Sequence, residues 1–217
     1  MNMKNYAVIT GASSGIGQAF AREFARRGIS TIMVARSEEK LNQLSAELES
    51  KFNADAISFP MDLADLSSRS SLVKFCATNN LEIDYLVNSA GYGSNGLFHK
   101  LDIQREMRMA ELNCLALQEL NYEFVKVFLK KTRATIINIA STAAFQPVPF
   151  MASYAATKSF VLSFRLALHR ELKGSGVNVM AVCPGPVGTN FFDNAGIKSS
   201  PTFPSMHTPS YVVKKVF

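Results

Sequence analysis

Three side chains in the second half of the chain have the types and spacing for acid–base chemistry. Tyr154 and Lys158 are four residues apart in a helical pattern, so both lie on one helix face. We expect the ammonium to lower the pKa of the phenol from about 10 toward neutral, which suits proton transfer. Ser141, in the loop after a strand, is expected to hydrogen-bond a substrate oxygen as charge develops there.

A fourth candidate, Asn113, lies within a long helical stretch in the segment ELNCLA. Its side chain could hold a water that links Lys158 to solvent and relays protons. The alternative is a polar residue packed inside the helix layer. A tyrosine four residues before a lysine also occurs by chance on many solvated helices, so a second motif has to support the site.

That second motif is the segment TGASSGIG at residues 10–17, which connects an apolar strand to an amphipathic helix. Gly11 permits a tight turn, Gly15 lets the backbone approach phosphates, and Gly17 allows close packing of helix on sheet. The helix N-terminus offers unpaired N–H groups, so the segment predicts a pyrophosphate site. Its spacing differs from the commoner G-x-G-x-x-G, and the alternative is an ordinary glycine-rich turn.

The end of the second predicted strand bears on the choice between NADP(H) and NAD(H). An NAD enzyme usually has a carboxylate here that accepts hydrogen bonds from ribose hydroxyls, whereas this chain has Ala35 followed by Arg36. A guanidinium suits a 2′-phosphate, so the sequence favours NADP(H), with a solvated surface arginine as the alternative. Ser37 could add a hydroxyl donor or cap the next helix.

Two further loops follow predicted strands and are expected to contact the cofactor. In MDLAD, the Asp62 carboxylate could accept the adenine amino protons while the Leu63 backbone lies beside the ring. Asp62 as a turn residue is a close alternative. In NSAG, Asn88, Ala90 and Gly91 would let the cofactor lie flat against the backbone.

Short apolar runs alternate with helical stretches, and this alternation predicts an α/β fold of Rossmann type, with one doubly wound parallel sheet in a single domain. The predicted strands cover residues 6–10, 31–35, 56–60, 85–88, 135–140 and 178–183. The predicted helices cover residues 16–27, 38–51, 66–79, 103–131 and 154–172, and the fourth is long enough to be two helices. Ligands should bind beyond the carboxyl ends of the strands.

The composition narrows the class of protein. The chain has 217 residues, 47% of them hydrophobic and 18% charged, which fits one globular domain. The cysteines, Cys76, Cys114 and Cys183, are widely spaced and predict reduced thiols with no metal site. Neither a membrane helix nor a signal peptide is expected, and the net charge of +6 is scattered, so we expect a cytoplasmic protein that binds neither membrane nor nucleic acid.

The motifs resemble those of the short-chain dehydrogenase/reductase family over nearly the whole chain. The resemblance rests on TGASSGIG, NSAG, the position of Asn113, Ser141, the Tyr154-x-x-x-Lys158 pair and PGPVGT. It implies a catalytic tetrad of these four residues, in which Tyr154 protonates the carbonyl oxygen while hydride arrives from C4 of the nicotinamide. It also implies that Lys158 holds the nicotinamide ribose and that the PGPVGT loop lines the carboxamide.

The motifs and the resemblance together predict an NADP(H) site with many contacts. These are Gly11, Ser13, Ser14, Gly15, Ile16, Gly17, Arg36, Asp62, Leu63, Asn88, Ala90, Gly91, Tyr154, Lys158, Pro184, Gly185, Val187 and Thr189.

The chain departs from the family pattern at three places. Ser89 replaces a second asparagine that is more frequent in the family, and Ala140 precedes Ser141 where a serine is common. The chain also stops after TPSYVVKKVF, where a member would usually complete a helix and add a last strand, so we expect that strand to be missing. Those elements often form a dimer contact, and the expected assembly is a homodimer or a homotetramer.

The sequence therefore predicts an NADPH-dependent oxidoreductase acting on a carbonyl or alcohol carbon of a small substrate. Residues 186–210 are expected to form a flexible substrate loop. Apolar side chains near the expected cleft indicate an apolar substrate, although simple packing of the loop is the alternative: Phe145, Val148, Phe150, Phe191 and Phe192. Two other functions stay open, an NADP(H)-binding sensor or scaffold with little turnover and a nucleic-acid-binding protein.

Overall fold

Six parallel strands form one sheet in the computed structural model, in the order β3-β2-β1-β4-β5-β6. The structure describes residues 4–197 and 206–217. The strands are β1 (Asn5–Thr10), β2 (Ser30–Ala35), β3 (Ala56–Pro60), β4 (Glu82–Asn88), β5 (Ala134–Ile139) and β6 (Val177–Val182). The predicted doubly wound parallel sheet is confirmed, and each predicted strand lies within a few residues of an observed one.

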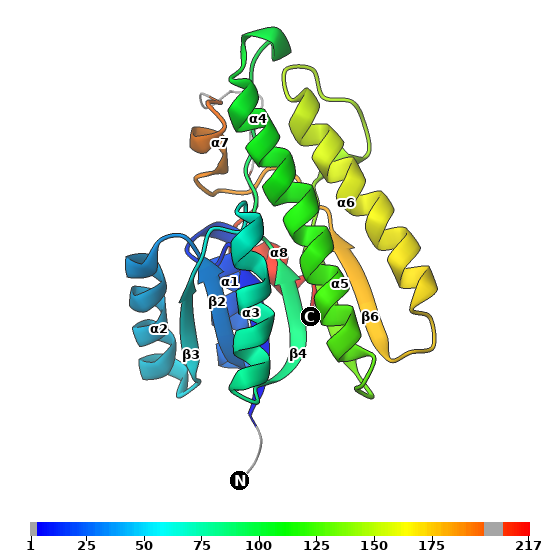
Figure 1. Ribbon diagram of the computed structural model, residues 1–217. Coiled ribbons are helices and arrows are strands. Elements are labelled where there is room, and N and C mark those ends of the chain that lie inside the picture. Colours follow the sequence, from blue (N-terminus) through cyan, green and yellow to red (C-terminus); the bar gives the residue numbers. More distant parts are fainter. Residues whose placement is uncertain (1–3, 198–205) are drawn as a thin grey trace.

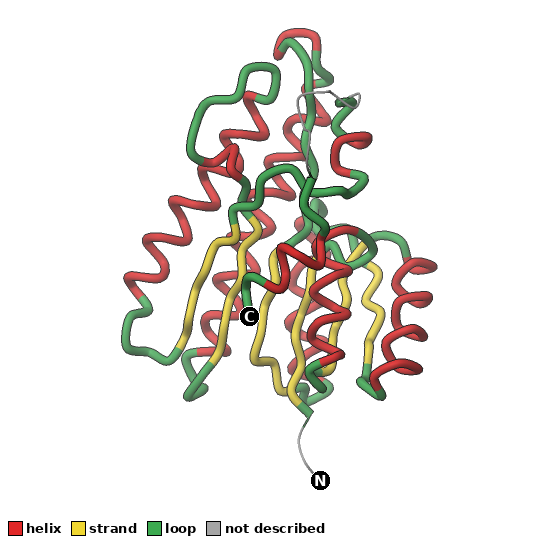
Figure 2. The backbone as a smooth tube through the Cα atoms, turned by 180° about the vertical axis from the view of Figure 1, so that it is seen from behind, coloured by secondary structure: helices red, strands yellow, loops and turns green. Residues whose placement is uncertain are grey.

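Helices cover both faces of this sheet, which is why its strands are apolar on both sides (Figures 1 and 2). On one face, Phe20 of α1 (Gly15–Arg26), Leu41 of α2 (Glu38–Phe52) and Val213 of α8 (Pro209–Lys214) are buried against the sheet. On the other face, Leu72 of α3 (Leu66–Thr78) and Phe124 of α5 (Leu117–Phe128) are buried. The residues of β1 divide between these two cores by the alternation of its side chains.

The predicted helix 103–131 is one helical rod made of three parts. It consists of α4 (Ile103–Ala110), a π-helical stretch η2 (Glu111–Ala116) and α5. The rod crosses the sheet beside α6 (Ala152–Glu171), as Figure 1 shows. A π-helical stretch inside an α-helix often marks a functional site, and this one contains Asn113.

The loops after β4, β5 and β6 lie beyond the carboxyl ends of the strands. They contain the short helices η1 (Phe98–Lys100), η3 (Thr142–Ala144) and α7 (Phe191–Asn194). The predicted substrate loop 186–210 thus includes α7 and the start of α8, with Val187 bridged to His207. Its residues 198–205 lie outside the described part of the chain.

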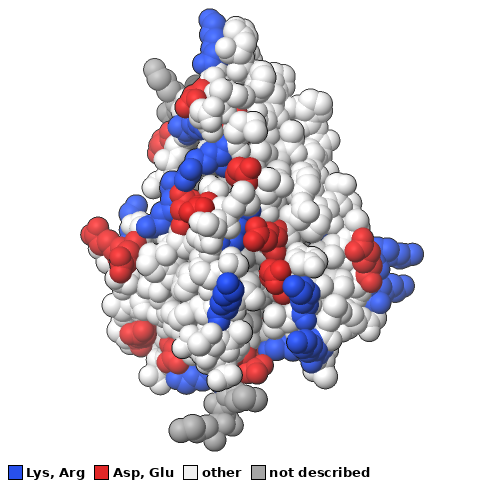
Figure 3. All heavy atoms as spheres, in the orientation of Figure 1, with Lys and Arg blue, Asp and Glu red and all other residues white. Residues whose placement is uncertain are grey.

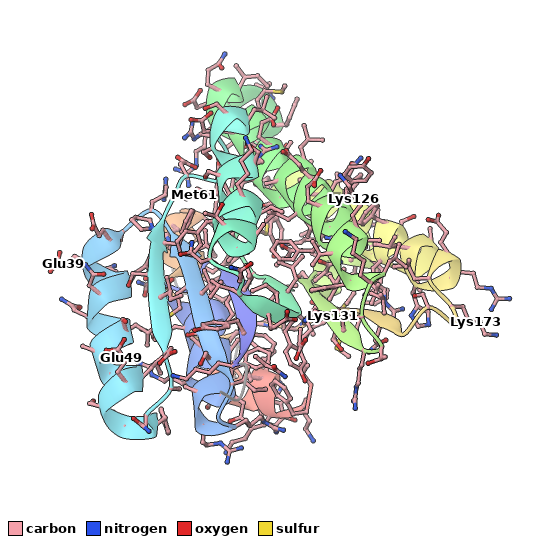
Figure 4. The ribbon with its side chains drawn as sticks, turned by 60° about the horizontal axis from the view of Figure 1, so that its bottom comes forward. Glu39, Glu49, Met61, Lys126, Lys131 and Lys173 are labelled. Atoms are coloured by element: carbon pink, nitrogen blue, oxygen red, sulfur yellow. The ribbon has the colours of Figure 1, made fainter. Side chains whose placement is uncertain are left out.

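At the other end of the sheet, away from the predicted site, ion pairs connect β4 to the segment after α5. There Lys131, labelled in Figure 4, follows α5 and pairs with Glu82 at 2.9 Å and Asp84 at 2.7 Å in β4. Met61, also labelled, lies directly after β3 at the opposite end. Among the described residues, no helix is both long enough and apolar enough to span a membrane.

Candidate active site

A cavity of about 520 Å³ lies beyond the carboxyl ends of the strands. Most of the predicted site residues line it: Gly11, Ser13, Ser14, Gly15, Ile16, Arg36, Asp62, Leu63, Ala90, Gly91, Ser141, Tyr154, Lys158, Pro184, Gly185, Val187 and Thr189. Three predicted residues, Gly17, Asn88 and Asn113, do not line it. The fold therefore brings residues from the loops after all six strands into one space.

The glycine turn is packed backbone to backbone against the loop after β4. A Cβ on Gly11, whose φ is +68°, would lie 2.9 Å from the backbone of Ala90. The Thr10 hydroxyl accepts hydrogen bonds from the Ser89 and Ala90 amides, each at 3.0 Å. A Cβ on Gly17 would lie 2.4 Å from the Gly11 carbonyl oxygen, so Gly17 serves the packing of α1 against the turn and does not line the cavity.

Helix α1 begins at this turn with its first N–H groups available to a ligand. Its N-cap residue Ser14 makes no side-chain capping hydrogen bond, and its first turn has no acidic residue. By contrast, Ser37 caps α2 and Asp65 caps α3 through their side chains. An uncapped helix N-terminus beside glycines that admit a close approach fits the pyrophosphate of a dinucleotide. The capping role predicted as one option for Ser37 is confirmed.

Two guanidinium groups and one carboxylate line the same end of the cavity. Arg36 is exposed there, at the end of β2. Asp62 accepts a hydrogen bond from the Ala64 amide at 3.0 Å, so it is a turn residue, and it also lines the cavity. Its second carboxylate oxygen pairs with Arg108 of α4 at 2.5 Å. Two positive side chains, one of them paired with a carboxylate, thus line this end of the cavity.

The Tyr154 and Lys158 side chains are both buried at the other end of the cavity, each 7% exposed. The Lys158 Nζ lies 5.7 Å from the centroid of the Tyr154 ring and donates a hydrogen bond to the Ile139 carbonyl at 2.9 Å. Burial raises the pKa of Tyr154 above 10, opposed by a hydrogen bond with Ser141. Burial also lowers the pKa of Lys158 to about 8.

The prediction that Lys158 lowers the pKa of Tyr154 is therefore wrong for this structure. The two residues do share a helix face, but removal of the phenol from water disfavours its charged form. The interaction that lowers the pKa of Tyr154, and so favours tyrosinate, is the hydrogen bond with the Ser141 hydroxyl.

The Ser141 side chain joins the loop after β5 to the cavity. Its hydroxyl accepts a hydrogen bond from the Ala143 amide at 3.1 Å, which caps η3 and fixes the direction of the side chain. The same residue lines the cavity next to Tyr154. Ser141 can therefore hydrogen-bond an oxygen that Tyr154 also reaches.

Asn113 lies behind the cavity wall and is 1% exposed. Its amide nitrogen donates to the Tyr92 carbonyl at 3.0 Å and to the Thr157 hydroxyl at 3.1 Å, and its oxygen accepts from the Tyr92 amide at 3.2 Å. These hydrogen bonds fit the alternative interpretation of Asn113, a polar residue packed inside the helix layer. The side chain fastens the loop after β4 to the α6 turn that carries Lys158.

Asn88, predicted to contact the cofactor, does not line the cavity, and its side chain is engaged elsewhere. Its side chain is 4% exposed and donates to Asn138 of β5 at 2.9 Å, while Asn138 in turn bonds with Asn121 of α5. The last residue of β4 points between the sheet and α5, away from the cavity, because side chains alternate along a strand. This buried amide network joins β4, β5 and α5.

The apolar part of the cavity is formed by α7 and by the loop after β5. The Phe191 ring packs against Tyr154 with 5.1 Å between ring centroids, and Phe192 and Val148 also line the space. Phe145 and Phe150, predicted to lie near the cleft, are 67% and 56% exposed and do not line it.

Comparison with known proteins decides the family. A family model described as short chain dehydrogenase matches residues 5–200. The chain belongs to the short-chain dehydrogenase family. The predicted family is thus confirmed.

This short-chain dehydrogenase is similar in sequence to curated proteins and in structure to solved ones. A very-long-chain 3-oxoacyl-CoA reductase of Mus musculus is 32% identical over 188 residues, which cover 85% of this chain and 60% of that protein. The chain thus spans about 60% of the length of the first curated relatives that it matches.

Two solved structures share its fold closely. A short-chain dehydrogenase from Sphingobium yanoikuyae in complex with NADPH has a TM-score of 0.90 at 32% identity, covering 99% of this chain and 83% of that chain. The bulky-bulky ketone specific alcohol dehydrogenase from Comamonas testosteroni has a TM-score of 0.86 at 30% identity, covering 100% and 82%.

Sequence reasoning missed one charged residue of the site in this short-chain dehydrogenase, Arg108. It lines the cavity and pairs with Asp62, which is 46 residues away in the chain. No local pattern links two such positions. The one feature of the sequence that could have pointed to Arg108 is its position on the polar face of α4, a helix that begins beyond the carboxyl end of β4.

Proposed function

We propose that the protein is an NADPH-dependent oxidoreductase that transfers hydride between the nicotinamide and a carbonyl or alcohol carbon. One observation carries the proposal: Ser141, Tyr154 and Lys158 line one end of a cavity whose other end is formed by the glycine turn and Arg36. An acid–base group and a dinucleotide cradle in one space are what such a reaction requires.

The residues that would hold the cofactor are proposed from the cavity lining together with what the family resemblance implies. The uncapped N-terminus of α1 would receive the pyrophosphate, and Lys158 would hold the nicotinamide ribose, with Pro184, Gly185, Val187 and Thr189 beside the carboxamide. The preference for NADP(H) over NAD(H) is supported by Arg36 and by Ala35, which puts no carboxylate at the end of β2.

The side chains of the chain itself would handle the proton. When bound, the nicotinamide supplies the hydride to the carbonyl carbon. Because burial raises the pKa of Tyr154, the phenol is protonated at neutral pH and can donate its proton to the substrate oxygen. The Ser141 hydroxyl would hydrogen-bond the same oxygen and stabilise the negative charge that develops on it.

The lining near Tyr154 supports an apolar carbonyl substrate. Val148, Phe191 and Phe192 offer apolar contacts on one side of the space that the substrate would enter. The relatives named above act, by their names, on a 3-oxoacyl-CoA and on bulky ketones. A ketone with apolar substituents is accordingly the substrate class that we propose.

We further propose a cytoplasmic homodimer or homotetramer. Support for the assembly comes from apolar side chains exposed on the two adjacent helices α5 and α6, of which Tyr122 is 63% and Leu166 54% exposed. Figure 3 shows few charged side chains over the upper part of α6. The cytoplasmic location rests on the unpaired cysteines alone.

A single-turnover experiment tests the reaction and separates it from the sensor or scaffold alternative. Enzyme in excess is mixed with NADPH and a panel of ketones that differ in the size of their apolar groups, and the loss of NADPH absorbance is followed. We expect oxidation of one equivalent of NADPH with at least one apolar ketone. Tight NADPH binding without oxidation across the panel would support the sensor instead.

A further inference from the structure

Arg69 of α3 is a buried charged residue with several hydrogen bonds and no part in the chemistry above. Its side chain is 1% exposed. Its Nε donates to the Leu63 carbonyl at 2.7 Å, its Nη1 to Glu119 at 2.9 Å, and its Nη2 to Glu111 at 3.5 Å. One guanidinium thus joins the loop after β3 to the rod formed by α4, η2 and α5.

A charge in this position is costly unless all its hydrogen-bonding groups are satisfied, and here each nitrogen has a partner. The carboxylates of Glu111 and Glu119 are 33% and 36% exposed, so they could be solvated without Arg69. The Leu63 carbonyl, in contrast, accepts a charge-assisted hydrogen bond from Arg69 and would lose this donor if Arg69 were replaced.

The loop that Arg69 holds forms one end of the cavity. Asp62 and Leu63 both line the space, near Arg36. Arg108 of α4 also contacts this loop, through an ion pair with the Asp62 carboxylate at 2.5 Å. Two guanidinium groups from different helices therefore fix two consecutive residues of this loop, one through a backbone carbonyl and one through a side chain.

We propose that Arg69 is a positioning residue that sets the loop at residues 62–63 for the adenosine half of the dinucleotide. The proposal rests on the proposed function, because it takes the cavity to be a dinucleotide site. Arg69 itself does not line the cavity and acts through Leu63. Its loss should weaken binding of the adenosine half and leave the acid–base end, formed by Ser141 and Tyr154, unchanged.

The test uses Arg69→Met, which keeps much of the side-chain volume and removes the donors. Binding of NADPH and of adenosine 2′,5′-bisphosphate, which lacks the nicotinamide half, is measured by calorimetry, and kcat is measured at saturating NADPH. We expect both dissociation constants to rise by the same factor, about 5- to 20-fold for one charge-assisted hydrogen bond, with kcat within about twofold of wild type. Arg69→Lys serves as a second variant if Arg69→Met fails to fold, with the same expectation at a smaller factor.

The matched control is Arg165→Met. Arg165 of α6 also donates from Nε to a backbone carbonyl, that of Val179 at 3.0 Å, and does not line the cavity. We expect this variant to bind both ligands like wild type. Unchanged ligand affinity in the Arg69 variants, an equal loss in Arg165→Met, or a loss confined to kcat would overturn the positioning role. If wild type bound neither ligand, the proposed function itself would fail.

Discussion

The Lys158 ammonium donates its hydrogen bond to the Ile139 carbonyl, at 2.9 Å, and lies 5.7 Å from the centroid of the Tyr154 ring. Both side chains are buried, so each is held in its uncharged form more strongly than in water. The pair is consequently a protonated phenol beside an amine whose pKa is close to physiological pH. This arrangement suits proton donation to a carbonyl oxygen.

The pKa of Lys158 predicts how stability depends on pH. Because the pKa falls from 10.5 in the unfolded chain to about 8 in the folded protein, the unfolded chain binds more protons between these values. Stability from this group therefore rises with pH from about 8 upward. The raised pKa of Tyr154 acts in the opposite direction, but only above pH 10.

Urea denaturation of wild type and Lys158→Met at pH 7.5, 8.5 and 9.5 measures this effect, since the other titrating groups cancel in the difference. We expect the unfolding free energy of wild type to gain about 1 to 2 kcal/mol over the variant across this range. Parallel pH profiles for the two proteins would show that Lys158 is charged well above pH 8 in the folded state.

The features that sequence reasoning predicted correctly depend on residues close together in the chain. Gly11, Gly15 and Gly17 act within one turn, and the alternation of strands and helices is set by local periodicity. The gathering of Ser141, Tyr154 and Lys158 at one cavity followed from the rule that ligands bind beyond the carboxyl ends of parallel strands.

The errors concern properties that depend on packing between distant segments. Whether burial or a neighbouring charge controls the pKa of Tyr154 is set by α7 and by the loops around it, through contacts such as Phe191. The direction of Asn88 depends on partners in β5 and α5. Arg108 and Asp62 meet only because α4 passes over the loop after β3.

The position of Arg36 leads us to expect that its removal weakens NADPH binding more than NADH binding. Arg36→Ala removes the guanidinium expected at the 2′-phosphate, so NADPH binding should weaken by about 1.5 to 3 kcal/mol, whereas NADH binding should change little. Dissociation constants measured by fluorescence titration check this expectation. Lys40→Ala is the control, because this exposed cation of α2 lies outside the cavity lining. Equal losses for the two cofactors would contradict the role given to Arg36.

Phe150 has a strained backbone, with φ of +66° in a region that bulky residues rarely adopt. Its ring is 56% exposed, so Phe150→Gly loses little buried surface and relieves the strain. We expect the unfolding free energy to rise by about 1 kcal/mol in urea denaturation. Phe145→Gly, at a residue with φ of −96°, should instead lower it. The same loss in both variants would show that Phe150 is unstrained.

The central claim is that Tyr154 supplies the proton in a hydride transfer from NADPH. The most direct measurement follows deuterium from [4,4-²H₂]NADPH into the carbinol carbon of the alcohol formed from an apolar ketone, by mass spectrometry, for wild type and Tyr154→Phe. We predict that wild type transfers the label, and that the variant binds NADPH equally well but transfers it about 10²- to 10⁴-fold more slowly. A variant that transfers deuterium at the wild-type rate would contradict the account.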